Sequence, residues 1–207
     1  MIKQAIIPLA GLGTRLLPLT SVFAKELLPI NGKPGIEYIL DECIEAGIKE
    51  VIFIISKKKL MIKKYFYNDK FYQNIIKQKK DLRIIKEYKK ILKYKKMIKF
   101  VFQDKPLGTG DAVFKTKKLI KDKFFLMLLP DDLIIKKNCS KSMISIHKKF
   151  NSSVMASMRV NKDEVSRWGI YNIKKKIDNM NFIIKSVVEK PSTKQAPSNN
   201  AVIGRYI

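Results

Sequence analysis

Residues 10–15 read Ala-Gly-Leu-Gly-Thr-Arg and directly follow the apolar run Ala-Ile-Ile-Pro-Leu at positions 5–9. A short apolar run that leads into glycines and then a basic residue is typical of a β-strand that ends in a phosphate-binding turn. Because glycine has no Cβ, the backbone N–H groups of Gly11 and Gly13 can approach an anion closely. Arg15 then adds a positively charged fork that matches phosphate oxygens.

This glycine turn differs from the two commonest nucleotide-binding loops. A P-loop ends in Gly-Lys followed by Ser or Thr, whereas Gly13 is followed by Thr14 and Arg15. A dinucleotide-binding fingerprint has a third glycine where this chain has Leu16. Taken alone, the turn is equally well explained as an ordinary tight turn, so the rest of the chain has to distinguish the two interpretations.

Apolar runs alternate with segments of helical periodicity. Apolar residues at 36, 39, 40, 43 and 44 share one face of a helix that Gly47 ends. The other expected elements are strands at 5–9, 51–55, 98–102, 124–129, 153–160, 169–173, 183–189 and 202–207, and helices within 57–97, from 108 to 119 and from 140 to 150. This order predicts a three-layer α/β/α, Rossmann-like fold with a mixed, mostly parallel sheet, in which ligands bind at the carboxyl ends of strands. As the final strand, 202–207 is expected to leave an unpaired edge.

The chain carries a formal net charge of +25, from 43 Lys and Arg against 18 Asp and Glu. Such a charge is compatible with nucleic-acid binding. Only five of the basic residues are Arg, however, and Arg is the residue that base readout and phosphate clamping favour. The lysines are spread along the whole chain and accompany many Ile and few Ala, as A+T-rich codons would produce. We therefore favour a solvated basic surface over a nucleic-acid patch.

Several protein classes are disfavoured by the composition. No apolar run reaches the roughly 20 residues of a membrane span, and the first strand begins too near Met1 for a signal peptide to precede it. Cys43 and Cys139 lack metal-site spacing, which predicts reduced, buried thiols. The single histidine, His147, excludes a metal site built on a pair of histidines. We expect a cytoplasmic protein that does not bind a membrane.

Four further residues place useful chemistry at the ends of apolar strands. Asp131 could hold Mg²⁺ together with substrate phosphates, or could form a turn. The amide of Gln103 can pair with the edge of a pyrimidine, although a lone glutamine more often faces solvent. Glu189 and Lys190 point to opposite sides if the chain stays extended there, and the alternative is an exposed surface pair of little energetic weight.

With Lys-Glu-Leu-Leu-Pro at 25–29, the glycine turn resembles the signature of the sugar-1-phosphate nucleotidyltransferases, and the leucine between its glycines resembles the bacterial uridylyltransferase type. Pro-Leu-Gly-Thr-Gly at 106–110 and Val-Val-Glu-Lys-Pro at 187–191 extend the match. The resemblance implies a GT-A-like nucleotidyltransferase fold with one domain over residues 1–207. It also implies that this domain lacks a C-terminal part bearing a second metal-binding Asp, and that a full-length form is a homo-oligomer.

The resemblance assigns roles residue by residue. The nucleotide-binding residues would be Ala10, Gly11, Gly13, Thr14, Arg15, Gln103 and Gly108. The sugar phosphate would contact Gly169, Glu189, Lys190 and Val202. Asp131 would bind Mg²⁺, and the catalytic residues would be Arg15, Lys25 and Lys190. The chain departs from the pattern at Asp111, where the uridylyltransferases usually have His, so a preference for uracil is less firmly implied than nucleotide binding.

The implied reaction forms UDP-glucose and pyrophosphate from UTP and glucose 1-phosphate. An oxygen of the sugar phosphate attacks the α-phosphate in line, and it needs no strong base because it is already ionised. The barrier is repulsion between anions, about 4 kcal/mol per charge pair at roughly 4 Å, which cationic side chains and Mg²⁺ offset. The alternatives are a thymidylyltransferase of the same family, or a truncated non-catalytic protein that binds nucleotide or nucleic acid.

Overall fold

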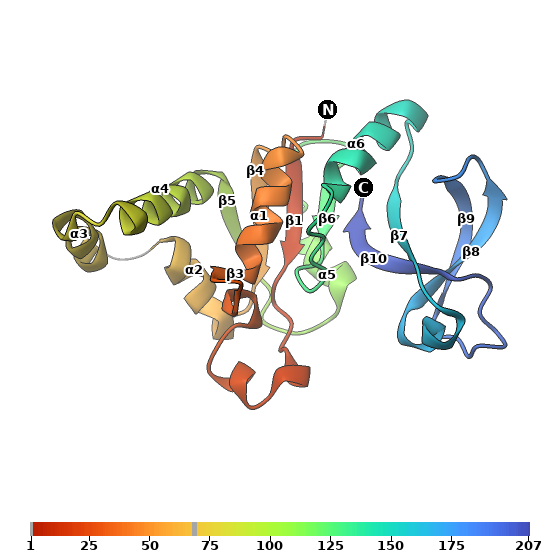
Figure 1. Ribbon diagram of the computed structural model, residues 1–207, viewed down its shortest axis with the longest axis horizontal. Helices are drawn as coiled ribbons and strands as arrows, with labels where there is room; N and C mark the ends of the chain where they lie inside the picture. The colour runs from red at the N-terminus through yellow and green to blue at the C-terminus, as the bar shows by residue number, and fades with distance from the viewer. Residues whose placement is uncertain (1, 68–69) are drawn as a thin grey trace.

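The computed structural model describes residues 2–67 and 70–207. Its main sheet has eight strands in the order β5-β4-β1-β6-β10-β8-β9, with β7 paired to β10 (Figure 1). The strands are β1 (Gln4–Pro8), β4 (Glu50–Ile55), β5 (Ile98–Phe102), β6 (Leu126–Leu128), β7 (Met155–Arg159), β8 (Gly169–Lys176), β9 (Phe182–Glu189) and β10 (Asn200–Tyr206). A separate small hairpin consists of β2 (Pro29–Ile30) and β3 (Lys33–Pro34).

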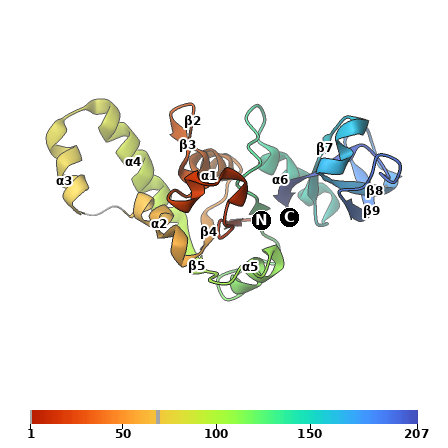
Figure 2. The same ribbon diagram turned by 90° about the horizontal axis from the view of Figure 1, so that it is seen from below.

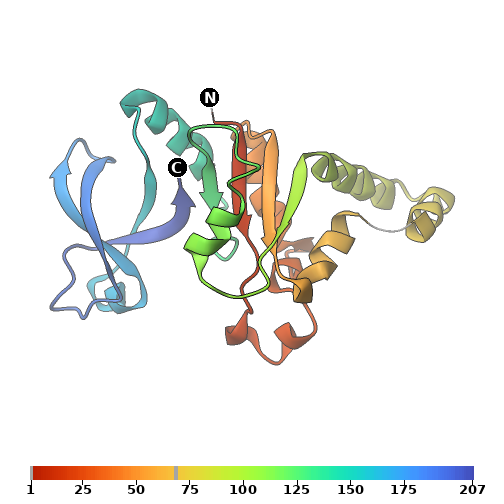
Figure 3. The same ribbon diagram turned by 180° about the vertical axis from the view of Figure 1, so that it is seen from behind.

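Helices cover both faces of this sheet. The α-helices are α1 (Gly35–Glu45), α2 (Leu60–Phe66), α3 (Lys70–Lys79), α4 (Leu82–Met97), α5 (Thr109–Lys115) and α6 (Cys139–Phe150). The 3₁₀ turns are η1 (Thr14–Leu16), η2 (Leu19–Ser21), η3 (Lys25–Leu27), η4 (Lys57–Lys59) and η5 (Lys162–Arg167). Figures 1 and 3 show α1 and α6 on one face of the sheet and α5 on the other. The predicted three-layer arrangement is confirmed.

The parallel part of the sheet contains the main core. β5, β4, β1 and β6 pair in parallel, and the central strands are buried on both faces. Ala5 and Ile7 of β1 belong to the core that α1 covers, whereas Ile6 packs with Ala112 of α5. This alternation explains the uninterrupted apolar runs in the sequence, because each successive side chain meets a helix layer on one face or the other.

The expectation of an unpaired edge at 202–207 is wrong. β10 lies inside the sheet and pairs antiparallel with all its neighbours: with β6 through its end, with β8 through its start, and with β7 at both its start and its end. Close packing at Gly204 makes this possible, since a Cβ on Gly204 would lie 2.5 Å from Cβ of Leu129. The strand thereby joins the parallel part of the predicted mixed sheet to an antiparallel part.

Three elements are shorter than expected, among them the strand expected at 153–160, which spans only Met155–Arg159. The helix expected to reach residue 119 ends at Lys115, and the strand expected from residue 124 begins at Leu126. The side chain of Gln4 explains much of the difference, because its Nε2 donates to the carbonyl of Leu119 and its Oε1 accepts from the N–H of Lys121. These bonds hold the segment between the two elements as a loop.

The helices expected within 57–97 are present, apart from residues 68 and 69, which lie outside the described residues. α3 and α4 extend away from the sheet, as Figures 1 and 2 show. The ring of Phe66 in α2 contacts that of Tyr94 in α4, and both residues are buried.

Elsewhere, Cys43 and Cys139 are free thiols, and only Cys43 is buried. No helix in the described part of the chain is long and apolar enough to cross a membrane.

Candidate active site

Two neighbouring cavities open at the carboxyl ends of β1 and β6. The larger has a volume of about 710 Å³ and is lined by the glycine turn, η3 and the loop after β6. The smaller, of about 310 Å³, is lined by the start of the glycine turn, Gln103 and the start of α5. Lys25, Glu26, Pro130 and Asp131 line both cavities, so the two form one composite site.

The glycine turn has the left-handed conformation that its sequence requires. Gly13 has a φ of 68° and immediately precedes η1. A Cβ at this position would lie 3.1 Å from Cγ2 of Thr20, whose hydroxyl donates to the Gly13 carbonyl at 2.8 Å. Arg15 and Thr14 are exposed and line the larger cavity. The turn therefore presents backbone and a guanidinium group to the cavity, as expected for an anion site.

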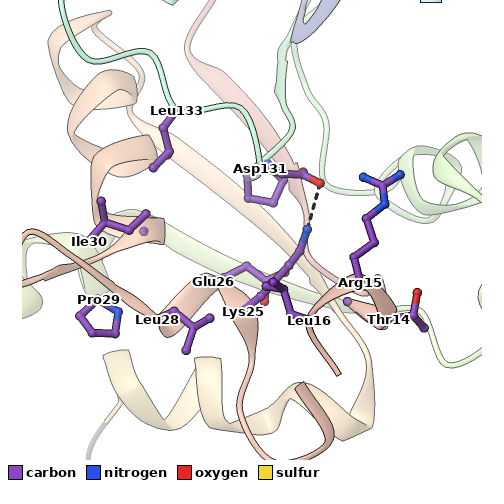
Figure 4. A pocket seen from close by; sticks show the side chains of 13 residues that line it. Thr14, Arg15, Leu16, Lys25, Glu26, Leu28, Pro29, Ile30, Asp131 and Leu133 are labelled. Atoms are coloured by element: carbon purple, nitrogen blue, oxygen red, sulfur yellow. Dashed lines mark hydrogen bonds and ion pairs between the residues drawn. The ribbon is translucent and has the colours of Figure 1, made fainter. Parts of the chain in front are cut away.

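Lys25 and Asp131 meet between the two cavities. The ammonium of Lys25 lies 2.9 Å from Oδ2 of Asp131, and the guanidinium of Arg15 rises beside this pair (Figure 4). Partial burial acts to raise the pKa of Asp131, but the hydrogen bond and charge of Lys25 outweigh it and hold that pKa below its usual value. Asp131 is thus a carboxylate at neutral pH, with its second oxygen not engaged by Lys25.

The smaller cavity brings together Gln103 and Gly108. Gln103 is buried, and its Nε2 donates to the Gly108 carbonyl at 3.1 Å and to Oδ2 of Asp111 at 2.7 Å. Gly108 has a φ of 91° and precedes α5. Ala10 and Gly11 line the same cavity. The predicted nucleotide-binding residues therefore divide between two connected cavities.

The predicted sugar-phosphate residues form a second group on β8, β9 and β10. Gly169 pairs with Glu189 across the strands, and a Cβ on Gly169 would lie 3.1 Å from Oε2 of Glu189 and 3.4 Å from Cγ2 of Val202. A side chain at 169 would therefore require these neighbouring side chains to move by a few tenths of an ångström. None of these residues lines either of the two cavities.

Lys190 does not continue the strand. It has a φ of 45°, and its N–H donates to the carbonyl of Trp168 at 3.0 Å. The backbone turns at Lys190, so the extended chain on which the alternation of Glu189 and Lys190 depends is not present there. A left-handed lysine costs of order 1–3 kcal/mol and is typical of functional positions.

Sequence reasoning missed a buried clamp beneath Asp131. Arg205 on β10 is fully buried, and its guanidinium pairs with the carboxylate of Glu42 on α1, with Nη2 2.8 Å from Oε2. The same group donates to the carbonyls of Leu129 and Asp132, which bracket the Asp131 turn, at 3.1 and 2.7 Å. Arg205 follows Gly204 in an apolar run, and its long-range partner Glu42 is visible only in the fold.

A second buried ion pair lies under the shared wall of the cavities. Both oxygens of Glu26 accept from the ammonium of Lys59, at 2.7 and 2.8 Å, and both side chains are buried. Burial lowers the pKa of Lys59, and the charge of Glu26 opposes that shift. The pair attaches η3, which carries Lys25, to η4, which follows β4. No signal in the sequence distinguishes Lys59 from its lysine neighbours.

The donor set suits a Mg²⁺ ion that is shared with a substrate. Mg²⁺ usually takes one or two carboxylates and completes its shell with water and substrate phosphates. Asp131 offers one carboxylate at the cavity wall, whereas Oδ2 of Asp132 accepts from the N–H of Gly204 at 2.6 Å. Among the described residues no cluster of three or more acidic, His or Cys side chains could hold a metal by itself. The residues present therefore fit a metal held partly by phosphates.

The fold and the site define a class of phosphate-transferring enzyme, and the sequence matches the nucleotidyl transferase family model over residues 4–207. The chain belongs to this family. It is similar to UTP–glucose-1-phosphate uridylyltransferase 2 of Streptococcus pyogenes, with 34% identity over 211 residues that cover all of this chain and 70% of the relative.

Solved structures show the same likeness. A UDP-glucose pyrophosphorylase in complex with UDP-glucose matches with a TM-score of 0.85 and 33% identity, covering all of this chain and 75% of that one. The UTP-bound enzyme of this name from Acinetobacter baumannii matches with a TM-score of 0.91 and 32% identity, covering all of this chain and 74% of that one. The chain thus spans about three quarters of the length of these relatives.

Proposed function

We propose that the protein forms UDP-glucose and pyrophosphate from UTP and glucose 1-phosphate. The observation that carries the proposal is the meeting of the glycine turn, Lys25 and Asp131 around one composite site. The uridylyltransferases named above support the choice of UTP and glucose 1-phosphate within the family. The proposal includes no organic cofactor, because the reaction only transfers a nucleotidyl group between phosphates.

The two cavities suggest how a nucleotide lies in the site. The base would enter the smaller cavity against Gln103 and Gly108, and the triphosphate would extend past the glycine turn into the larger cavity. Arg15 and Lys25 would neutralise phosphate charge there, and pre-positioned cations of this kind lower the barrier most where charge develops in the transition state. Mg²⁺ held by Asp131 would supply further positive charge at the phosphates.

The sugar phosphate would approach from β8 and β9. Glu189 can accept hydrogen bonds from sugar hydroxyls, Gly169 and Val202 would let the ring lie close to the strands, and Lys190 would hold the phosphate. An oxygen of that phosphate forms a new bond to the α-phosphorus. The bond from the α-phosphorus to the bridging oxygen breaks, and pyrophosphate leaves with the electron pair.

Pyrophosphate release by the purified chain tests this proposal. UTP, dTTP and CTP are each offered with glucose 1-phosphate and Mg²⁺, and the sugar nucleotide is identified by chromatography. We expect release with UTP, and a loss of at least about a hundredfold in turnover for Lys25→Met, since Lys25 faces developing charge. Lys185→Met is the matched control, because Lys185 is exposed on β9. Release with dTTP but not UTP would favour the thymidylyltransferase, and no release with any nucleotide would contradict the proposal.

A further inference from the structure

The hydrogen bonds around Gln103 fix which way its amide faces. Nε2 donates to Oδ2 of Asp111 at 2.7 Å and to the backbone carbonyl of Gly108 at 3.1 Å. A carboxylate and a carbonyl can only accept hydrogen bonds. Turning the amide over would place Oε1 against two acceptor oxygens at these distances, so the two partners together exclude the reversed orientation.

Asp111 makes the larger contribution to this restraint. A hydrogen bond to a carboxylate is shorter than one to a neutral peptide carbonyl and roughly twice as strong. The bond to Asp111, at 2.7 Å, is accordingly shorter than the bond to the Gly108 carbonyl, at 3.1 Å. Asp111 lies in the first turn of α5, where the helix dipole favours a negative charge. The ammonium of Lys115, one turn further along, lies 3.9 Å from its other oxygen.

The orientation leaves one polar atom of Gln103 for a ligand. In the described part of the chain no group donates to Oε1 of Gln103, while the side chain lines the smaller cavity with Ala10 and Gly11. A base that places a ring N–H at this oxygen gains a hydrogen bond. A base with a ring acceptor at the same place meets a lone pair instead.

We propose that Asp111 is a specificity-determining residue, which holds Gln103 as an acceptor and so selects uracil over cytosine. Uracil carries a hydrogen on N3, whereas N3 of cytosine is an acceptor. This inference rests on the proposed function in one respect, namely that the pyrimidine occupies the smaller cavity. Asp111 does not itself touch the base; it is a positioning residue that acts through Gln103.

A structural role alone would give a different result. If Asp111 only attached α5 to the loop at 103–108, its loss would lower the stability and weaken the binding of all nucleotides alike. The ratio of affinities for UTP and CTP responds only to the orientation of the amide. That ratio also needs no turnover, so it can be measured whether or not the chain is catalytically active.

Calorimetric titration of the full chain with UTP and with CTP provides the test. We expect the wild type to prefer UTP, and Asp111→Asn to reduce that preference at least about tenfold, because Asn can donate to a reversed Gln103 amide. Asp111→Glu keeps an acceptor and should keep the preference. Asp104→Asn is the matched control, because it also removes one negative charge next to Gln103 in the sequence. The Asp104 side chain is half exposed, and its Oδ2 lies 3.6 Å from the ammonium of Lys57.

Each outcome bears on the proposal. An unchanged UTP-to-CTP ratio in Asp111→Asn overturns the role of Asp111 and leaves the proposed function standing. Equal binding of the two nucleotides by the wild type overturns the inference about Gln103 but not nucleotide binding. A wild type that binds neither nucleotide overturns the proposed function, and the inference with it. A loss of preference in Asp111→Asn that Asp104→Asn does not share supports the proposal.

Discussion

The buried pair of Arg205 and Glu42 makes a strong prediction about stability. Replacing Glu42 by Leu removes the partner of a guanidinium group that is fully buried, and it also removes the acceptor of the Ser140 N–H. The carboxylate is itself only 6% exposed, so water cannot replace it without a rearrangement of the core. Arg205 would keep its three bonds to backbone carbonyls, at Leu129, Gly204 and Asp132.

The expected cost is large relative to the whole stability of a domain. Breaking a buried ion pair by removing one partner costs about 3–5 kcal/mol, against a total of roughly 5–15 kcal/mol for a typical domain. With a urea m-value of about 2–3 kcal/mol/M, the unfolding midpoint should fall by roughly 1–2.5 M. Glu45→Leu is the matched control on the same helix, because Glu45 is exposed, and it should cost no more than about 1 kcal/mol.

Equilibrium unfolding in urea, followed by far-ultraviolet circular dichroism, measures these changes. A double-mutant cycle with Arg205→Met separates pairing from packing, since the double variant leaves no charge without its partner. We expect the double variant to lose about 1–3 kcal/mol less than the sum of the single losses. A loss below about 1 kcal/mol for Glu42→Leu, or strict additivity in the cycle, would refute the reasoning.

Three further predictions follow from single positions. Gly204→Ala should lower the unfolding free energy by about 1–3 kcal/mol or more, measured in urea, because its Cβ would lie 2.5 Å from Cβ of Leu129. Lys190→Gly should lower turnover without lowering the unfolding free energy by more than about 1 kcal/mol, since glycine adopts a φ of 45° without strain; a loss above about 2 kcal/mol would contradict this. Because Lys25 holds the pKa of Asp131 below its unfolded value, Asp131 contributes stability above about pH 4 that is lost as the pH falls through its folded pKa. The stability difference between wild type and Asp131→Asn should therefore disappear in acid, and a difference that persists there would count against the ion pair.

Much of the fold could be predicted because its signals are local. The apolar run at 51–55 predicts a strand with both faces covered. The helical spacing from 36 to 44 predicts a helix with one buried face. The position of β10 could not be predicted in this way. The apolar run at 202–207 looks the same in the sequence whether the strand lies at an edge or inside the sheet. Its pairing with β6 depends on close packing at Gly204, which the local sequence pattern does not reveal.

The candidate site divides in the same manner. Residues within the glycine turn, such as Gly13 and Arg15, could be singled out because they lie next to one another in the sequence. Gln103 was assigned as a base-reading residue, but the acceptor that orients it was treated only as a departure from the family pattern. Glu42 and Lys59 had no signal at all, since buried charges are recognised by their partners and those partners lie far away in the chain.

The place of β10 in the sheet has a consequence for how the protein folds. The pairing of Arg205 with Leu128 joins positions far apart in the chain, and contacts of such long range form slowly because loop closure must precede them. Until β10 docks, β6 has an open edge and the carbonyls around Asp131 lack the guanidinium that fixes them. Assembly of the catalytic apparatus is therefore expected to be a late folding event, and an intermediate without β10 would be the species most exposed to aggregation.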